Sequence, residues 1–580
     1  MRKNVFLQNI EKLNSLMNEG RFAEGIALCR ALLAEVKALD IQADNDNVCR
    51  RLYQMNAAIV IEQGHKELAV EAIKLLDIYA DDAYCNFLKA RLYWLLEEQF
   101  QALLALESYY KITVSGDSLF FDKNSKLFAL DSNMQQRVLN FLGHIYKFFS
   151  MPVVAAQCSF WAQDVVKDLP VKWQEYSNYL FDLHYLFMSK EDYFQAHAGF
   201  NKLFQGIDQF KHDKEKHIVH KKIKIGYISS DFRQHVCLLF IWSMLTAYDR
   251  GCFEVYVFSR SVVEDEYSSL IKERVGHWFN VSRRSIEDSA RTIFEQEIDI
   301  LVDLAGHASG NGLPIMAYKP APVQVCGIGY FATTGLQAVD YFLTDKYLVN
   351  ENTQQYFIEK LLILPHSHFC YTPLNDMPTG SRDAPCKKKG YVTFGSFNNL
   401  TKVNDEVLLA WAKILHQVPG SRLILKGDML GTAEGVEIIK QKLLSLDVEE
   451  ARFDLRPFTL PYLEQYYEVD IALDTFPYPG GGTTCDALYM GVPVVTLGDG
   501  SHGGNFGISL LKNIGLDECC TCSRQEYIER AVLLASDYEL LDALHRGLRN
   551  MMDKSPVLDS DMYMRDLEDG YKKIWSEYTS

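Results

Sequence analysis

The chain has 580 residues, of which 48% are hydrophobic, and its formal net charge at pH 7 is −17. Its length predicts two to four domains, because a single hydrophobic core stops growing at roughly 250–300 residues. The acidic balance argues against nucleic acid and anionic membranes as partners, since both attract clustered positive charge.

The distribution of apolar residues and cysteines predicts a cytoplasmic protein without a membrane span. No run of 18 apolar residues occurs, and Met1, Arg2 and Lys3 lead into mixed polar sequence instead of a signal peptide. The 13 cysteines lie mostly in apolar segments, as expected of reduced thiols. The cluster 519–522 has no partner ligands at zinc spacing, so we do not expect a metal site there.

Residues 1–215 carry helical periodicity and predict an all-α domain. Paired helices, such as 83–94 and 100–106, resemble degenerate tetratricopeptide repeats, which stack and leave a concave surface that suits a polypeptide. An all-α cap that only stabilises the next domain is the alternative. The helices are separated, at intervals of roughly 34 to 52 residues, by turns near Gly20, Gly64, Glu97, Ser150 and Ser189.

From Lys222 onward, short apolar runs alternate with helical segments, which predicts parallel sheets in an α/β fold. A polar stretch at 373–390 divides the runs into two groups, so we expect Rossmann-like domains at 216–375 and 376–580. Their strand ends would enclose a cleft. Helices at 524–548 and 562–578 follow, and at least one is expected to pack back on the first α/β domain. The predicted strands are 222–229, 253–259, 299–304, 323–329, 341–344, 361–364, 391–397, 422–425, 453–456, 471–473 and 494–497.

The strongest local signal for a ligand follows the strand at 471–473. Glycines at 480–482 lead into Thr483 and Thr484, which open a helix. Glycines let the backbone approach a ligand, and the first turn of a helix offers unpaired N–H groups to an anion. The two hydroxyls add donors, and Asp486 can accept bonds from a ribose diol. The segment predicts a diphosphate nucleotide site, although by itself it also fits a flexible turn with a good helix cap.

Polar residues follow other predicted strands at the same sheet edges. His235 comes after the strand at 225–229 and is a candidate proton acceptor or hydrogen-bond donor to substrate. Lys402 follows the strand at 391–397, where an ammonium group suits the neutralisation of a departing diphosphate. A solvent-facing histidine and a surface lysine are the alternatives. Strand ends also place polar groups at His307, Tyr330, Thr333 and Asn399.

Four motifs, in order over residues 222 to 545, resemble those of the O-linked N-acetylglucosamine transferase family. The similarity is greatest to its bacterial and SPINDLY-type members, in which degenerate helical repeats precede a two-domain GT-B unit. The motifs are Gly226–Phe232 with His235, Gly329 and Tyr330 with Thr333–Gly335, Phe397–Leu400 with Lys402, and Leu473–Tyr478 with Thr483–Leu488.

This resemblance implies an inverting, metal-independent transfer of a sugar from a nucleotide diphosphate to a protein side chain. It implies that Lys402 stabilises the leaving diphosphate, that Thr483 and Thr484 hold its oxygens, and that His235 is the general base or an orienting group. Neither Asp-x-Asp pair, at 44–46 and 559–561, follows a strand, so the sequence predicts no metal or other cofactor. The nucleotide-sugar site implied by the resemblance comprises Asn399, Tyr462, Gly482, Thr483, Thr484, Asp486, His307, Tyr330 and Thr333.

Two departures from the family pattern leave the donor open. Tyr462 stands where a base-stacking histidine is common, and Gly482 stands where a further threonine is usual. The favoured reaction moves N-acetylglucosamine from its UDP conjugate to Ser or Thr. The alternatives are O-fucosylation from GDP-fucose, N-glucosylation of Asn from UDP-glucose, and a non-catalytic scaffold that senses a nucleotide. The resemblance implies a protein acceptor, such as a bacterial surface or flagellar protein, bound partly by the repeat domain.

Overall fold

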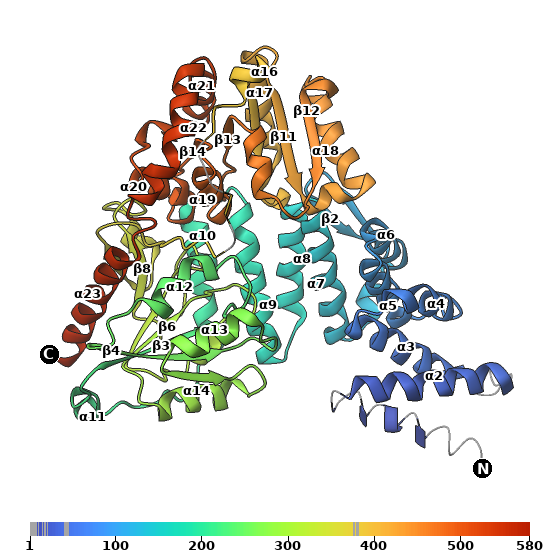
Figure 1. The fold of residues 1–580 in the computed structure, drawn as a ribbon. Helices are drawn as coiled ribbons and strands as arrows, with labels where there is room; N and C mark the ends of the chain where they lie inside the picture. Colours follow the sequence, from blue (N-terminus) through green and yellow to red (C-terminus); the bar gives the residue numbers. More distant parts are fainter. Residues whose placement is uncertain are drawn as a thin grey trace. The chain divides into compact units, whose positions relative to one another are not determined.

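The computed structural model describes residues 8, 9, 11–13, 15, 16, 19, 21–39, 46–374, 377, 378 and 382–580. Contacts divide the chain into two compact units, Met1–Lys147 with Val153–Lys167, and Phe148–Pro152 with Asp168–Ser580 (Figure 1). The domain boundaries expected at 215 and 375 rest on sequence patterns and stay a prediction. The expected turn at Gly20, the first aspartate of the Asp-x-Asp pair at 44–46 and part of the stretch at 373–390 lie outside the described residues.

The first unit consists of paired helices, as the sequence predicts, and one short hairpin that it does not. Asp82 caps helix α5 by accepting a bond of 2.9 Å from the backbone N–H of Cys85. The hairpin strands β1 (Ile112–Ser115) and β2 (Ser118–Phe121) are antiparallel and too short to show a strand period. The helices are α2 (Phe22–Leu39), α3 (Asp46–Gln63), α4 (Lys66–Asp77), α5 (Ala83–Leu95), α6 (Gln99–Tyr110), α7 (Ser132–Phe148) and α8 (Pro152–Val165).

The second unit contains two parallel sheets, which confirms the predicted α/β fold. The first sheet has seven strands in the order β5-β4-β3-β6-β7-β8-β9. Its strands are β3 (Ile223–Ser229), β4 (Phe253–Ser259), β5 (His277–Asn280), β6 (Ile300–Asp303), β7 (Val323–Cys326), β8 (Tyr341–Asp345) and β9 (Lys360–Leu364). The helices of this half are α9 (Leu169–Asp182), α10 (Lys190–Ala198), α11 (Lys214–Ile218), α12 (Leu238–Thr246), α13 (Glu266–Arg274), α14 (Ile286–Glu295) and α15 (Leu313–Met316).

The second sheet has six strands in the order β12-β11-β10-β13-β14-β15. Its strands are β10 (Thr393–Ser396), β11 (Arg422–Gly427), β12 (Phe453–Pro457), β13 (Ile471–Leu473), β14 (Val494–Leu497) and β15 (Cys520–Thr521). The accompanying helices are α16 (Cys386–Lys389), α17 (Asp405–Gln417), α18 (Ala433–Ser445), α19 (Gly482–Tyr489), α20 (Phe506–Asn513), α21 (Arg524–Ala535), α22 (Tyr538–Asp553) and α23 (Ser560–Thr579).

Helix α23 packs back on the first sheet, as expected from the sequence. The hydroxyl of Tyr341 on β8 donates to Glu577 at 2.8 Å, and Glu568 accepts from the backbone N–H of Asp249 at 2.7 Å. The two edge strands β5 and β15 were not predicted. The side chains of β5 are only partly buried, and β15 has two residues, so neither gives an apolar run.

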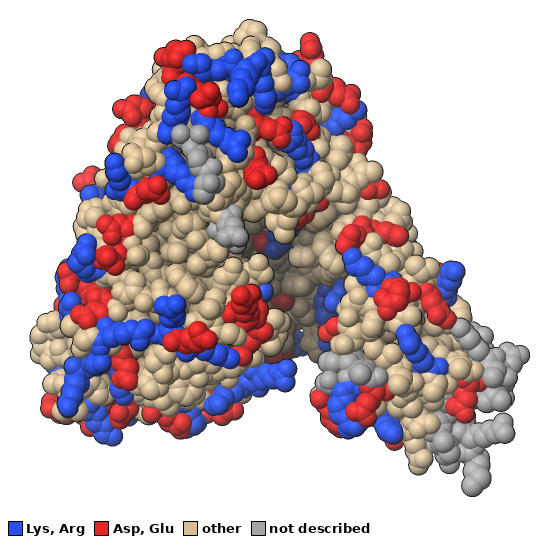
Figure 2. Space-filling model, in the orientation of Figure 1, with Lys and Arg blue, Asp and Glu red and all other residues tan. Residues whose placement is uncertain are grey.

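Two expectations from the sequence, the absence of a membrane span and of a polyanionic partner, concern the helices and the surface. Among the described helices, none combines the length and the apolar character that crossing a bilayer requires. On the face drawn in Figure 2, lysines and arginines are interspersed with aspartates and glutamates. Mixed charge of this kind does not favour a polyanion, which binds clustered positive charge.

Candidate functional site

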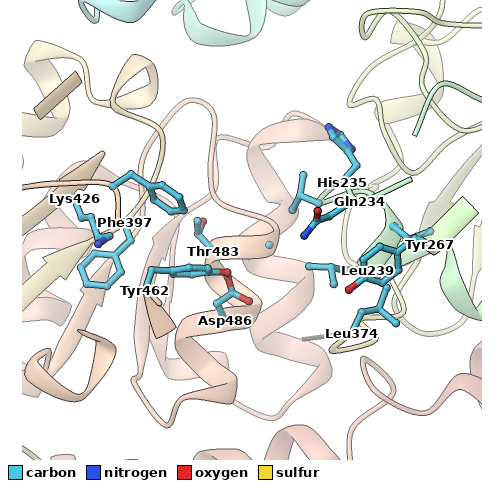
Figure 3. A pocket seen from close by; sticks show the side chains of 14 residues that line it. Gln234, His235, Leu239, Tyr267, Leu374, Phe397, Lys426, Tyr462, Thr483 and Asp486 are labelled. Carbon is cyan, nitrogen blue, oxygen red and sulfur yellow. The ribbon is translucent and has the colours of Figure 1, made fainter. Parts of the chain in front are cut away.

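A cavity of about 300 Å³ lies between the two α/β halves of the second unit and is lined by residues of both. Figure 3 shows Gln234, His235 and Tyr267 of the first half on one side, and Lys426, Phe397 and Tyr462 of the second half on the other. Thr483 and Asp486 lie between them. The cavity is at the carboxyl ends of the strands, where open α/β sheets bind ligands.

The glycine loop before α19 is held by a buried hydrogen-bond network. The backbone N–H of Gly480 donates to Asp474 Oδ1 at 2.7 Å, and Thr483 Oγ1 donates to Asn398 Oδ1 at 2.8 Å. No side chain caps the first turn of α19, which Gly481 precedes. Those N–H groups can therefore receive an anion. Thr484 is buried behind the loop, next to Gly480.

Lys402 is partly buried close to this loop, although it does not line the cavity. Its Nζ donates to the carbonyl oxygen of Pro479 at 2.9 Å and lies 3.7 Å from the ring centroid of Tyr478. Burial lowers the pKa of Lys402 to about 8, and attraction to Asp474 partly offsets that shift. The preceding Asn399 caps the turn, since its Oδ1 accepts from the backbone N–H of Thr401 at 3.0 Å.

Asp486 on α19 joins the two halves of the unit. Its Oδ1 accepts from the hydroxyl of Tyr371 at 2.6 Å, and its Oδ2 accepts from the hydroxyl of Tyr462 at 2.7 Å. Burial raises the pKa of Asp486, and the two phenol bonds act in the opposite direction. Each oxygen keeps one lone pair for a ligand. The structure shows Tyr462 as a donor to Asp486; its stacking on a base stays a prediction.

His235 lies in the loop after β3 and reaches the cavity. Its side chain is 36% exposed, and its Nδ1 lies 3.5 Å from Asp231 Oδ2. Val236 is next to Gly482, since a Cβ added to Gly482 would lie 2.8 Å from Val236 Cγ2. A threonine at this position requires Val236 to move. Val236 is 52% exposed, so its side chain can shift and the contact does not by itself exclude a threonine.

Three residues expected at the nucleotide sugar lie elsewhere, in a buried polar network. His307 Nδ1 lies 2.9 Å from Ser177 Oγ, and Tyr330 Oη lies 2.6 Å from His197 Nε2. Thr333 Oγ1 donates to Glu359 at 2.6 Å. These residues follow strands whose carboxyl ends share the sheet edge with the cavity. Helices α9 and α10, however, cover the sheet edge at His307 and Tyr330. The structure does not bring these residues to the cavity, and their role in sugar binding stays a prediction.

Two residues of the site were missed by sequence reasoning. Lys426 is the penultimate residue of β11 and lines the cavity, with its Nζ donating to Thr459 Oγ1 at 2.9 Å and to Gln465 Oε1 at 3.0 Å. Burial lowers the pKa of Lys426. A lysine at the end of an apolar strand is the signal that identifies it. Asn398 was part of a motif, but its contact with Thr483 depends on the tertiary fold.

Comparisons with known proteins point to one family. The sequence profile of glycosyl transferase family 41 matches residues 201–379 and 374–567. The chain is 38% identical over 417 residues to the probable UDP-N-acetylglucosamine–peptide N-acetylglucosaminyltransferase SPINDLY of Petunia hybrida, covering 69% of this chain and 44% of that protein. It is 30% identical over 382 residues to the probable enzyme of the same activity named SEC in Arabidopsis thaliana, covering 62% of this chain and 38% of SEC.

A solved structure has the same fold over the whole chain. It is a lysine-to-methionine mutant of the Thermobaculum terrenum O-GlcNAc transferase, with a TM-score of 0.75 at 23% identity, covering 100% of this chain and 98% of that one. The chain spans less than half the length of the curated relatives given above.

Proposed function

The chain belongs to glycosyl transferase family 41, and from that premise we propose that it transfers N-acetylglucosamine from a UDP conjugate to Ser or Thr of a protein acceptor. The observation that carries the proposal is the position of the partly buried Lys402 ammonium beside the glycine loop and the uncapped first turn of α19. A nucleotide-sensing scaffold has no need of a desolvated cation at that place. The names of the curated relatives support the choice of UDP-N-acetylglucosamine as donor.

The proposed reaction requires no metal, because this chain supplies its own charge compensation. Lys402 exchanges its bond to the Pro479 carbonyl for a diphosphate oxygen, while Thr483 and the N–H groups of α19 hold other oxygens. His235 takes the proton of the acceptor hydroxyl, which attacks the sugar opposite to the departing diphosphate and inverts the anomeric centre. The ribose diol donates to the free lone pairs of Asp486.

The acceptor is proposed to bind partly in the first unit. A hollow of about 540 Å³ is lined by helices α3, α5 and α7 of that unit. Arg91 and Arg137 line it, together with the aromatic side chains of Trp94 and Phe141. Such a surface fits a polypeptide with acidic and aromatic residues. Replacing both arginines with alanine should reduce transfer to protein while leaving hydrolysis of the donor unchanged. The cytoplasmic location and the natural acceptor stay predictions.

Two measurements test the proposal in sequence. A ligand that binds only the folded state raises the melting temperature with its concentration, so UDP should stabilise the protein and GDP should not. The intact mass of an acceptor incubated with protein and donor should then rise by one N-acetylhexosamine. Stabilisation by GDP alone and addition of a deoxyhexose would identify fucosylation instead. Binding without any mass change would favour the non-catalytic scaffold.

A further inference from the structure

Three histidines lie in the segment that enters the first sheet of the second unit, at positions 212, 217 and 220. The polar composition of this segment predicts a solvated linker, but the structure places its imidazoles against the sheet. His217 is buried on α11, and His220 is largely buried just after it. They meet Asp299, which is fully buried and immediately precedes β6.

The geometry around Asp299 brings the three side chains close together. His217 Nδ1 lies 2.7 Å from Asp299 Oδ1, and His220 Nδ1 lies 2.9 Å from the same oxygen. One possible ligand atom of each residue lies within 4.8 Å of the others. Ligand atoms around a tetrahedral Zn²⁺ are about 3.3 Å apart at bond lengths of about 2.0–2.1 Å. The two nitrogen–oxygen separations are shorter than this, so binding of a cation requires the two rings to move outward from Asp299, whose Oδ2 also accepts from the backbone N–H of Lys224 at 2.8 Å.

His212 adds an independent observation. Its Nε2 lies 2.8 Å from the carbonyl oxygen of Lys319, so this nitrogen carries the proton. Its Nδ1 then holds a lone pair, and that atom is buried without a hydrogen-bond partner. The ring centroid of His212 lies 5.6 Å from that of His217. Histidines that bind metals commonly donate one N–H to a carbonyl and offer the other nitrogen to the ion.

We propose that His217, His220 and Asp299 bind a divalent transition-metal cation of the Zn²⁺ class, with the imidazole of His212 beside the site. Imidazole and carboxylate are ligands that suit this class. Coordination through Nδ1 of His217 and His220 requires the ring proton of each to be on Nε2. The site carries the charge of Asp299, and Glu297 lies nearby, with its Oε2 3.7 Å from His220 Nε2.

The proposed site is separate from the candidate active site. Asp299 lies at the amino end of β6, whereas the cavity lies at the carboxyl ends of the strands. The cation would fasten residues 212–220 to the sheet and would not take part in sugar transfer. A second possible cluster, of Asp231, His235 and Cys237, lies at the cavity. It is less suited to a cation, because burial raises the pKa of the Cys237 thiol and disfavours the thiolate.

The test begins with the full chain after treatment with a chelator. Titration with Zn²⁺ against a competing chromophoric chelator should show one tightly bound equivalent, and the melting temperature should rise with free Zn²⁺. Co²⁺ should give the visible absorption of a tetrahedral site without a thiolate charge-transfer band. Such a band would place the ion on a cysteine thiolate and overturn the proposal.

The decisive variants are His217→Asn and His220→Asn, because an asparagine amide preserves a donor to Asp299 but cannot replace the imidazole ligand. Each should weaken Zn²⁺ binding by more than about 10- to 100-fold, the range for loss of an outer-shell partner, while the melting temperature in chelator stays close to that of the natural chain. The matched control is His366→Asn. His366 Nδ1 also lies 2.7 Å from a carboxylate oxygen, that of Asp566, but this pair includes no second imidazole. It should bind Zn²⁺ normally. Absence of a bound equivalent, or binding unchanged in both asparagine variants, would refute the site.

Discussion

At the scale of single residues, the burial of Lys402 has a consequence for pH dependence. Its pKa of about 8 means that the ammonium loses its proton within the range of an ordinary assay. The charged form is the active one in the proposed reaction, so kcat/KM should fall about tenfold per pH unit above that pKa. Measuring kcat/KM from about pH 7 to 9.5 checks this. A profile that stays flat across the range would show that this ammonium does not act in the free protein.

The two tyrosines bonded to Asp486 provide a matched pair of variants. Tyr462 lines the cavity and Tyr371 does not, yet each donates one short bond to the same buried carboxylate. Each change to phenylalanine should lower the free energy of unfolding by about 1.5–3 kcal/mol, the range for hydrogen bonds to charged groups. Phenylalanine keeps the ring that is predicted to stack on the base, so UDP affinity is compared in the alanine variants, where only Tyr462→Ala should weaken UDP binding substantially. Calorimetric titration and denaturant unfolding check both effects, and equal losses of UDP affinity would contradict the assignment of Tyr462 to the nucleotide site.

At the scale of elements, two neighbouring glycines in the loop before α19 differ in the space around them. A Cβ at Gly480 would lie 2.5 Å from Thr483 Oγ1 and 2.6 Å from Thr484 Oγ1, whereas a Cβ at Gly481 would meet nothing within 4 Å. Gly480→Ala should therefore displace both hydroxyls and reduce UDP affinity at least about tenfold, a loss of about 1.4 kcal/mol. Gly481→Ala should bind UDP nearly as the natural chain does. Similar affinities for the two variants would remove the loop from the diphosphate site.

The sequence predicts most of the elements that position the site, because buried parallel strands give continuous apolar runs. It misses the strands whose burial is partial or whose length is minimal, such as β5 and β15. Among the candidate residues, Thr483 and Asp486 reach the cavity because they share one local motif with the glycine loop. His307 shows the limit of the approach. Its place after β6 is visible in the sequence, but its burial against Ser177 depends on α9, which precedes that strand by more than a hundred residues.

At the scale of the whole molecule, the second unit is held together by contacts between its two sheets. Tyr371 binds Asp486, and Asp345 at the end of β8 accepts from Ser509 on α20 at 2.7 Å. His502 Nε2 lies 3.0 Å from Thr344 Oγ1. Helix α23, which follows the second sheet in the sequence, packs against the first sheet. These contacts fix the walls of the cavity against each other, which favours a preorganised site for a nucleotide.

The central claim is that a partly buried lysine compensates the charge of the departing diphosphate, and Lys402→Ala tests it most directly. Loss of a comparable preorganised donor costs about 2.7–4 kcal/mol of activation free energy. The variant should therefore transfer sugar to protein about 100- to 1,000-fold more slowly, as measured by single-turnover intact mass, while UDP still raises its melting temperature. Transfer at the natural rate by a folded, UDP-binding Lys402→Ala protein would contradict the account.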